Sequence, residues 1–344
     1  MSKNSAHTTM HALVVHQTGW PNAMQVEDRP RPAAGPDSVL IRVHAAGLNF
    51  ADTLVIGGSY QEKQALPFIP GAELSGEVIQ CGSEVRNIAV GDRVMGQVPA
   101  GAYAEYAVLH MHRLAVVPQA MPDREAAGFY VPYGTAICAL RERGRLKAGE
   151  TLLILGAAGA VGLAAIQVGK AMGARVIGVS RKPGKRDAVM RAGADAFISH
   201  ETGDLKAALK AAGEGGVDVV LDMVGSEATA QALRCLNFEG RLVIIGFTGG
   251  QAALLKSNHI LVKNIDIVGC YWGPYQTLRP EATRTAFDML FGWYAQGLLR
   301  PQVADTVDLS GISAALERLT AGQYAGKVVA TIAKNPSVHQ GDHA

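Results

Sequence analysis

Two patterns of apolar and polar residues divide the chain. From Met10 to Val108, short apolar runs recur at regular spacing, with turn signals such as Gly91-Asp92 between them. The runs that predict strands cover residues 12–15, 39–45, 73–80, 93–97 and 104–108. Short strands at regular spacing, without long helices, are typical of a barrel-like all-β domain.

Beyond about residue 121, apolar runs alternate with stretches of helical periodicity. Helices are expected over 121–143, 187–192, 204–212, 227–236, 280–296 and 312–320. Strands are expected over 196–198, 217–222, 241–246, 265–269 and 327–332, the last of which would rejoin the β domain. Strands that alternate with helices predict an α/β fold with a doubly wound parallel sheet. Its ligands bind at the carboxyl ends of the strands.

The clearest single unit runs from Thr151 to Ser180 and predicts strand, glycine-rich turn, helix and strand. Gly159 in the turn would let a pyrophosphate approach the backbone, and Gly162 would let the helix pack closely against the strand. The first glycine of the usual G-x-G-x-x-G motif is Ala157 here, with a glycine one place earlier. The order of the elements nevertheless indicates a dinucleotide site, with phosphates at the N-terminus of the helix.

The second strand of this unit ends in a basic segment, Ser180 to Arg186, which contains Arg181 and Lys185. An NAD site would have Asp or Glu at this place to bind the ribose 2′-hydroxyl. A hydroxyl group and cations suit a 2′-phosphate instead, so the segment favours NADPH. A solvated basic start of a helix is the alternative interpretation.

The composition adds few constraints. The chain has 344 residues, which predicts two domains, and a net charge of +2, too small to indicate a nucleic-acid surface. Residues 151–169 are uncharged and approach the length of a membrane span, but the glycine-rich turn interrupts them. The four cysteines are far apart, without C-x-x-C spacing, as in proteins of a reducing compartment. We therefore expect a soluble, cytoplasmic enzyme that does not bind membranes.

Several motifs together resemble one family over nearly the whole of residues 10–335. They cover residues 46–52 (AGLNFAD), 70–77 (PGAELSGE), 133–136 (YGTA), 157–162 (AAGAVG) and 326–329 (GKVV). The chain is similar to medium-chain dehydrogenases/reductases, in the zinc-independent, zeta-crystallin-like branch of NADPH:quinone oxidoreductases. Residues 1–9 are polar and without a pattern, which predicts a disordered tail. The resemblance implies a GroES-like β-barrel catalytic domain over 10–130 and 274–335. A Rossmann domain that binds NADPH would occupy residues 131–273.

The alcohol dehydrogenases of this superfamily hold a catalytic zinc ion through a cysteine in the first motif and a histidine in the second. The matching positions here are Asn49 and Ala72, and the third ligand position lies near Ala127. None of them offers a thiolate or an imidazole, and the cysteine loop of the structural zinc is missing. His110 and His112 could share a strand face, but we interpret them as surface residues. The resemblance thus implies an enzyme without zinc.

Without a Lewis acid, hydride transfer to an acceptor that is already electron-poor remains feasible, such as a quinone or an α,β-unsaturated carbonyl compound. The resemblance places Asn49 and Thr135 beside the nicotinamide, as catalytic residues that position it, while the protein donates hydrogen bonds to the oxygen of the acceptor. The implied cofactor-binding set is Asn49, Thr135, Gly159, Ala160, Val161, Ser180, Arg181, Lys185, His200, Val224, Phe247, Thr248, Cys270, Tyr271, Trp272 and Lys327.

Three aromatic residues are candidates for the substrate pocket. Tyr60 falls where related enoyl-thioester reductases keep a proton-donating tyrosine, although a tyrosine in such a turn can equally be a surface or packing residue. Tyr130 and Trp272 would shape the pocket, with core packing as the alternative.

The leading hypothesis is an NADPH-dependent quinone or enone reductase, and a 2-enoyl-thioester reductase is the alternative within the same class. A crystallin-like or RNA-binding role is a third hypothesis, for which the basic residues around Arg181 would form a phosphate-binding patch. The apolar run 265–270 is placed to be the last strand of the parallel sheet. Its open edge predicts a homodimer, as in the relatives that the chain resembles.

Overall fold

The computed structural model describes residues 9–19, 24–199 and 203–332. The chain divides into two compact units. Unit 1 consists of Met1–Tyr130, Val303–Gln323 and Lys327–Ala344, and unit 2 of Val131–Gln302 and Tyr324–Gly326. The expected tail falls outside the described residues except for Thr9, which begins the first strand. His200 also lies outside them.

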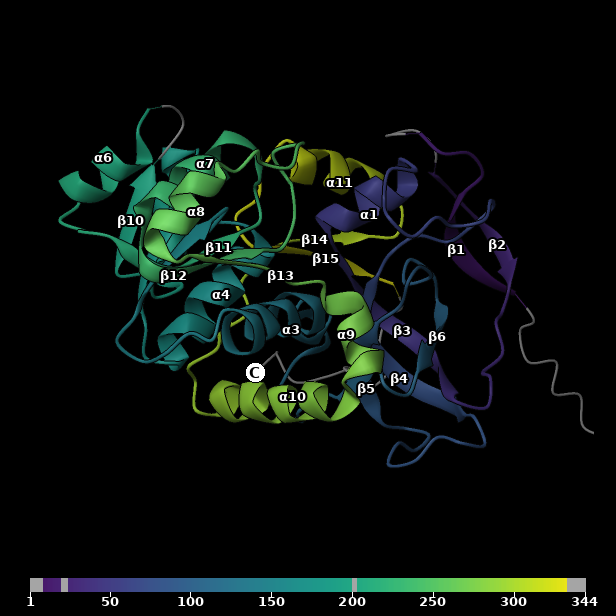
Figure 1. The fold of residues 1–344 in the computed structure, drawn as a ribbon. Helices are drawn as coiled ribbons and strands as arrows, with labels where there is room; N and C mark the ends of the chain where they lie inside the picture. The colour runs from purple at the N-terminus through teal and green to yellow at the C-terminus, as the bar shows by residue number, and fades with distance from the viewer. Residues whose placement is uncertain (1–8, 20–23, 200–202, 333–344) are drawn as a thin grey trace, which may run out of the picture. The chain divides into compact units, whose positions relative to one another are not determined.

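Unit 1 is built around one long strand, β3 (Ser38–Leu48), whose residues are nearly all buried. It belongs to a seven-stranded sheet with the order β14-β15-β3-β4-β5-β7, and β6 also pairs with β3 (Figure 1). The other strands of the sheet are β4 (Glu73–Cys81), β5 (Arg93–Gln97), β6 (Tyr106–His110), β7 (Leu114–Val116), β14 (Val303–Asp308) and β15 (Lys327–Thr331). A separate antiparallel pair joins β1 (Thr9–Val15) and β2 (Met24–Pro30). The helices of this unit are α1 (Phe50–Ile56), α2 (Asp123–Ala126) and α11 (Ile312–Thr320).

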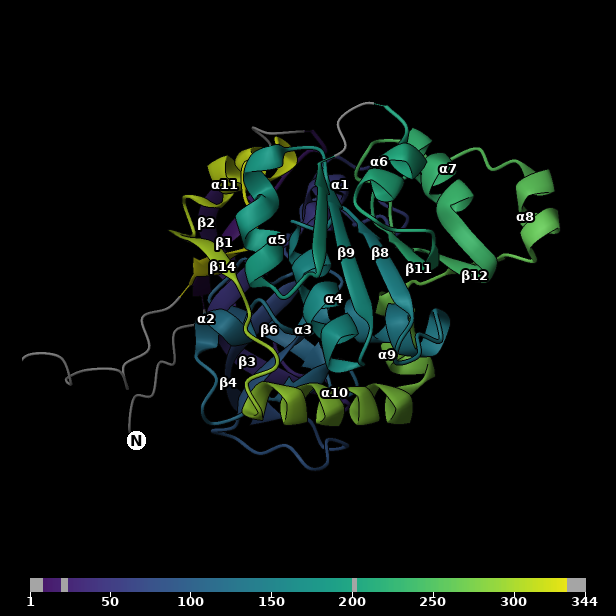
Figure 2. The ribbon, with the colours of Figure 1, turned by 90° about the vertical axis from the view of Figure 1, so that its left-hand side faces the viewer.

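Unit 2 contains a six-stranded, wholly parallel sheet with the order β10-β9-β8-β11-β12-β13. The strands are β8 (Thr151–Leu155), β9 (Arg175–Ser180), β10 (Ala196–Ser199), β11 (Val217–Asp222), β12 (Leu236–Ile244) and β13 (Asp266–Gly269). Figure 2 shows β9, β8 and β11 side by side in that order. The chain leaves the centre of the sheet in opposite directions from β8, which is the doubly wound arrangement that the alternating pattern predicts.

The helices of unit 2 precede, connect and follow these strands. They are α3 (Tyr130–Ile137), the π-helix η1 (Cys138–Arg143), α4 (Ala160–Ala171), the 3₁₀-helix η2 (Pro183–Lys185), α5 (Arg186–Arg191), α6 (Leu205–Ala211), α7 (Ser226–Cys235), α8 (Ser257–Lys263), α9 (Trp272–Leu278) and α10 (Pro280–Ala295). Among the described residues, no helix combines the length and the apolar character that a membrane span requires.

The carboxyl ends of the parallel strands lie in register. Leu155 pairs with both Val179 and Asp222, and Ile244 pairs with both Asp222 and Gly269. The turns after β8, β9, β11, β12 and β13 therefore begin at one edge of the sheet, where ligands bind in folds of this kind.

The structure places the second division between units after Gln302, whereas the expected boundary follows residue 273. Contacts within unit 2 hold α9 and α10 beside α3 and α4. A methyl group on Gly134 of α3 would lie 2.7 Å from the Trp272 ring on α9, which lies 6.3 Å from the ring of Phe287 on α10. The Gln167 amide on α4 donates to the Arg300 carbonyl at 2.9 Å and accepts from the Arg300 N–H at 2.7 Å.

Several expected elements also differ in their bounds, among them the strand expected over 241–246, which covers Leu236–Ile244. The strand expected over 104–108 covers Tyr106–His110, because Ala104 forms a separate bridge with Ala12 of β1. The helical stretch expected over 121–143 is divided into α2, α3 and η1.

Candidate active site

The glycine-rich turn after β8 is shaped for an anion. Gly156 has a φ of +79°, which favours glycine, and Gly159 is the N-cap of α4 without a side-chain capping bond. A methyl group on Gly162 would lie 2.4 Å from the Gly156 carbonyl oxygen, so only glycine allows this approach of helix to turn. A methyl group on Gly159 would meet that same oxygen at 3.5 Å, an ordinary contact. The backbone before Ala160 and Val161 is therefore open to a phosphate at the positive end of the helix dipole.

The segment after β9 is cationic and accessible. Ser180 is half-buried, Arg181 and Lys182 are exposed, and Lys185 is half-buried. Burial and the neighbouring charge of Lys182 lower the pKa of Lys185. A phosphate dianion placed among these groups would offset the repulsion between the two lysines. The segment thus fits the 2′-phosphate of NADPH.

The turn after β11 is shaped by a buried carboxylate that sequence reasoning missed, and a separate hydrogen bond links it to the turn after β12. Asp222 accepts hydrogen bonds from the N–H groups of Val224 (2.8 Å) and Gly225 (3.1 Å) and from the Thr229 hydroxyl (2.5 Å). The Thr248 hydroxyl donates to the Met223 carbonyl at 2.9 Å. These bonds bring together three of the expected cofactor residues, Val224, Phe247 and Thr248. Phe247 and Thr248 are exposed.

The stretch after β13 packs against α3 and η1 within unit 2. A methyl group on Gly134 would lie 2.7 Å from Cζ2 of Trp272, so the indole ring covers the turn of helix that carries Thr135. Cys270 and Cys138 are buried with their sulfur atoms 3.7 Å apart. Tyr271 is exposed. The expected residues Trp272 and Thr135 are thus neighbours, although they come from different segments. Tyr271 faces away from the core.

In unit 1, three strands bring an ammonium group, a carboxylate and an amide together. Lys327, the first residue of β15, forms an ion pair with Glu73 of β4, and both side chains are almost fully buried. The Lys327 Nζ also donates to Oδ1 of Asn49 at 2.7 Å. The Asn49 Nδ2 donates to the Gly47 carbonyl at 3.1 Å and to Glu73 Oε2 at 3.4 Å. Two expected residues, Asn49 and Lys327, therefore belong to one hydrogen-bonded group.

A second buried carboxylate extends this group. Asp52 on α1 accepts hydrogen bonds from the Tyr103 hydroxyl at 2.6 Å and from the Asn49 backbone N–H at 2.8 Å. Burial raises the pKa of Asp52 to about 6, although these hydrogen bonds and the charge of Lys327 oppose the shift. Burial and the neighbouring Asp52 raise the pKa of Tyr103. The partners Glu73 and Tyr103 were not among the expected site residues, although Glu73 lies within the motif of residues 70–77.

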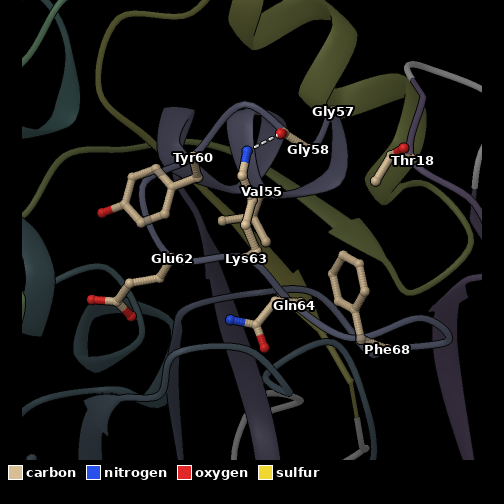
Figure 3. Close-up of a pocket in the computed structure, with 9 residues that line it drawn as sticks. All are labelled: Thr18, Val55, Gly57, Gly58, Tyr60, Glu62, Lys63, Gln64 and Phe68. Atoms are coloured by element: carbon tan, nitrogen blue, oxygen red, sulfur yellow. Dashed lines mark hydrogen bonds between the residues drawn. The ribbon is translucent and has the colours of Figure 1, made fainter.

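Tyr60 follows α1 and lines a small hollow of about 130 Å³. Figure 3 shows its ring beside Lys63, with the hydroxyl group pointing away from the lysine amine, which donates to the Gly58 carbonyl. Tyr130, by contrast, is fully buried, and burial raises its pKa. The roles of Tyr60, Tyr130 and Trp272 in a substrate pocket stay predictions.

The described residues also bear on whether the site could hold a metal ion. Across the described ranges 9–19, 24–199 and 203–332, no cluster of three or more His, Cys, Asp and Glu side chains is arranged to hold a metal ion. The expected zinc-ligand positions carry an amide, Asn49, and a methyl group, Ala72.

Comparison with known proteins agrees with both halves of this description. Residues 35–119 match the alcohol dehydrogenase GroES-like domain family, and residues 160–290 match the family described as zinc-binding dehydrogenase. The chain is 38% identical over 308 residues to quinone oxidoreductase-like protein 2 of Bos taurus, covering 89% of this chain and 88% of that protein.

Solved structures show the same likeness. A probable oxidoreductase from Mycobacterium abscessus is 36% identical, with a TM-score of 0.84 over 94% of this chain and 99% of that one. The Escherichia coli quinone oxidoreductase complexed with NADPH is 28% identical, with a TM-score of 0.86 over 93% of this chain and 99% of that one. The fold and the site define an oxidoreductase of the medium-chain dehydrogenase/reductase superfamily, with a GroES-like and a Rossmann domain. Within it, the chain belongs to the quinone oxidoreductase branch.

Proposed function

We propose that the protein is a zinc-independent reductase that transfers hydride from NADPH to a quinone or to an α,β-unsaturated carbonyl compound. Relatives named as quinone oxidoreductases support the reaction class, and the NADPH in the Escherichia coli structure supports the cofactor. The bound NADPH would supply the hydride, and the residues of this chain would bind and orient the reactants.

The observation that carries this proposal is the group around Asn49. A zinc alcohol dehydrogenase needs a thiolate and an imidazole to hold the ion that stabilises an alkoxide. Here Asn49, at the position that the resemblance matches to the cysteine ligand, is bound by the Lys327 ammonium, which also pairs with Glu73. Such a set of groups can position a ligand, but it offers no Lewis acid. It therefore suits acceptors that are electron-poor before they bind.

The basic segment after β9 supports NADPH over NADH. Its cations, Arg181 and Lys185, lie at the end of the strand where an NAD enzyme would have a carboxylate. A charge-assisted contact with the 2′-phosphate, worth ~1.4 kcal/mol, corresponds to a tenfold preference in kcat/KM.

A stopped-flow screen of cofactor oxidation against quinones, enones and crotonyl thioesters tests both parts of the proposal. We expect NADPH to exceed NADH in kcat/KM by about tenfold or more. Replacing both Arg181 and Lys185 with Ala should remove this preference. The matched control replaces Lys206 and Lys210, exposed on α6, and should preserve it. A wild-type preference for NADH, or one zinc ion per chain with loss of activity on chelation, would refute the proposal.

A 2-enoyl-thioester reductase is the second candidate. The observation in its favour is Tyr60, which lines the hollow of Figure 3 beside Lys63, where a hydroxyl group could deliver a proton. Turnover of crotonyl thioester that far exceeds turnover of quinones would establish this candidate instead.

Assembly as a homodimer and a cytoplasmic location complete the proposal. The open edge of the sheet at β13 supports the homodimer. The four cysteines, all free thiols, support the cytoplasmic location.

A further inference from the structure

Lys327 is an unusual residue to find in the interior. Its side chain is 4% exposed, and that of its partner Glu73 is 0% exposed. Three chain segments far apart in sequence meet at its ammonium group: the start of β15, the start of β4, and Asn49 between β3 and α1. Antiparallel pairing of β3 with both β15 and β4 sets these segments next to one another.

The backbone around Lys327 leaves room for its stem and for little else. A methyl group on Gly47 would lie 2.6 Å from the lysine Cε, and one on Gly128 would lie 2.8 Å from its Cγ. Two glycines therefore border the four-carbon stem, and the ammonium group beyond them is directed at Asn49 and Glu73.

Stability alone is a weak reason for this arrangement. Burying an ammonium group and a carboxylate costs several kcal/mol for each ion, and their attraction commonly does no more than offset that cost. A pair of apolar side chains would fill the same space at no such cost. The third member of the group, Asn49, is half-buried and is the one that a ligand can reach.

The bonds of Asn49 fix which way its amide faces. Its Oδ1 accepts from the Lys327 ammonium, and its Nδ2 donates to the Gly47 carbonyl and to Glu73. An amide nitrogen has two N–H donors, whereas an amide oxygen has two lone pairs. Both donors of Asn49 are thus directed at the protein. The Asn49 side chain also forms a capping box with Asp52 at the start of α1, so the amide is held in one orientation.

We propose that Lys327 is a positioning residue that acts through Asn49, holding the amide in one orientation at the place where a ligand can reach it. Because both N–H groups of this amide are directed at the protein, the donor to the oxygen of the acceptor must be another group. This role rests on the proposed function, but the amide orientation can be tested without turnover.

Chemical rescue tests the cation. In Lys327→Ala, we expect kcat/KM to fall by about 10²-fold, the loss that misplacing a reacting group by about 1 Å can cause. The deleted atoms correspond to n-propylammonium, which should restore activity by at least about tenfold, whereas 1-propanol, of equal size but neutral, should not. Lys170→Ala, which removes the cation of a partly exposed ion pair with Asp195, is the matched control and should respond to neither. Equal rescue by both compounds would overturn the proposal, since it would show that the stem only fills space.

A spectroscopic measurement tests the amide itself. In protein labelled with ¹⁵N-asparagine, the Asn49 side-chain NH₂ signals, identified by their loss in Asn49→Ser, should exchange slowly with solvent. Lys327→Ala should make this exchange at least about tenfold faster, and n-propylammonium should slow it again. Unchanged exchange in Lys327→Ala would contradict the proposal, whatever the substrate proves to be. A wild-type protein inactive with every quinone and enone would refute the proposed function alone.

The variant that leaves Glu73 without its cation could unfold, because an unpaired buried charge is strongly destabilising. Lys327→Met combined with Glu73→Gln removes both charges and preserves the volume. We expect this double variant to fold, as judged by circular dichroism, and to show fast exchange of the Asn49 amide with low kcat. A double variant with wild-type kcat and slow exchange would overturn the role of Lys327.

Discussion

Asn49 takes part in two bonding systems at once. Its amide group belongs to the Lys327–Glu73 pair, while its backbone N–H is given to Asp52, the third residue of α1. A substitution at Asp52 should therefore affect Asn49, as a substitution at Lys327 does. It acts through the backbone of Asn49 and not through its amide. The two carboxylates of this group differ, because Glu73 has a cation as its partner and Asp52 has only neutral donors.

The raised pKa of Asp52 predicts a pH dependence of stability. An aspartate in the unfolded chain titrates near 3.8, and the folded protein holds Asp52 near 6, so the folded state binds the extra proton between these values. The free energy of unfolding should then fall by roughly 2 kcal/mol as the pH rises from about 4 to about 6. Asp52→Asn cannot titrate and should flatten this slope in urea unfolding measured across that range.

Asp123 provides the control of opposite sign. Burial would raise its pKa, but hydrogen bonds from His44 and Arg93 hold it at about 2. Asp123 contributes to the free energy of unfolding above about pH 4, and this contribution is lost as the pH falls toward 2. This pH range lies below the range in which Asp52 titrates. If Asp123→Asn, and not Asp52→Asn, removed the slope between pH 4 and 6, the account of Asp52 would be wrong.

Tyr60 allows the two candidate reactions to be separated. Reduction of an enone leaves an enolate that needs a proton, whereas a hydroquinone anion is protonated readily by water. If Tyr60 is the acid, Tyr60→Phe should lower enone or enoyl-thioester turnover by ~10²-fold and change quinone turnover by only a few-fold. Small, equal losses with both substrates in the stopped-flow assay would show that Tyr60 only lines the hollow.

The site residues differ in how visible they are in the sequence. The glycine-rich turn and the basic segment after β9 are local patterns, so their place at one sheet edge could be predicted. The Lys327–Glu73 pair could not, because its members are 254 positions apart and meet only through strand pairing. For the same reason, the sequence shows no sign that Tyr103 donates to Asp52, 51 positions away.

At the level of elements, the turn between β8 and α4 contains two glycines with different expected roles. Gly162 matters for stability and Gly159 for cofactor binding. Gly162→Ala would force a methyl group to within 2.6 Å of two backbone oxygens, those of Gly156 and Ala157, which cannot move aside easily. Overpacking of this kind costs about 1–3 kcal/mol, so we expect a lower Tm. Gly159→Ala meets only an ordinary contact, so its Tm should match the wild type.

The same pair of variants reports on the phosphates. Gly159→Ala places a methyl group where the pyrophosphate would approach, and NADPH affinity by fluorescence titration should fall by about tenfold, on the order of one lost charge-assisted contact. Wild-type affinity in Gly159→Ala would show that this turn does not hold the phosphates.

Long periodic elements were predictable, and short ones that depend on partners were not. The strands of the parallel sheet follow the apolar runs closely, from β8 to β13. By contrast, β2 is largely exposed and polar, and it exists as a strand through its pairing with β1. Likewise β14 alternates half-buried and exposed positions and pairs in parallel with β15, which a local pattern does not reveal.

On the scale of the whole molecule, the outer strand of the parallel sheet indicates how chains assemble. β13 pairs with β12 on one side only, which confirms the predicted position of this run at the sheet edge. The Cys270 N–H binds the Ile244 carbonyl, so the alternation along the strand directs the Ile267 N–H outward. Leu261 and Val262 on the preceding helix α8 are 76% and 68% exposed, and their burial would favour association.

We therefore expect two chains to pair β13 with β13 across a twofold axis, joining two parallel sheets into one. Light scattering should report about twice the mass of one chain. Ile267→Pro removes an outward donor without breaking the inner ladder, since proline is tolerated at the solvent side of an edge strand, and it should yield a folded monomer. The control is Ala196→Pro at the first position of β10, the opposite edge, which should stay dimeric. A wild type that remains monomeric at every concentration, or an Ile267→Pro variant that still dimerises, would exclude this interface.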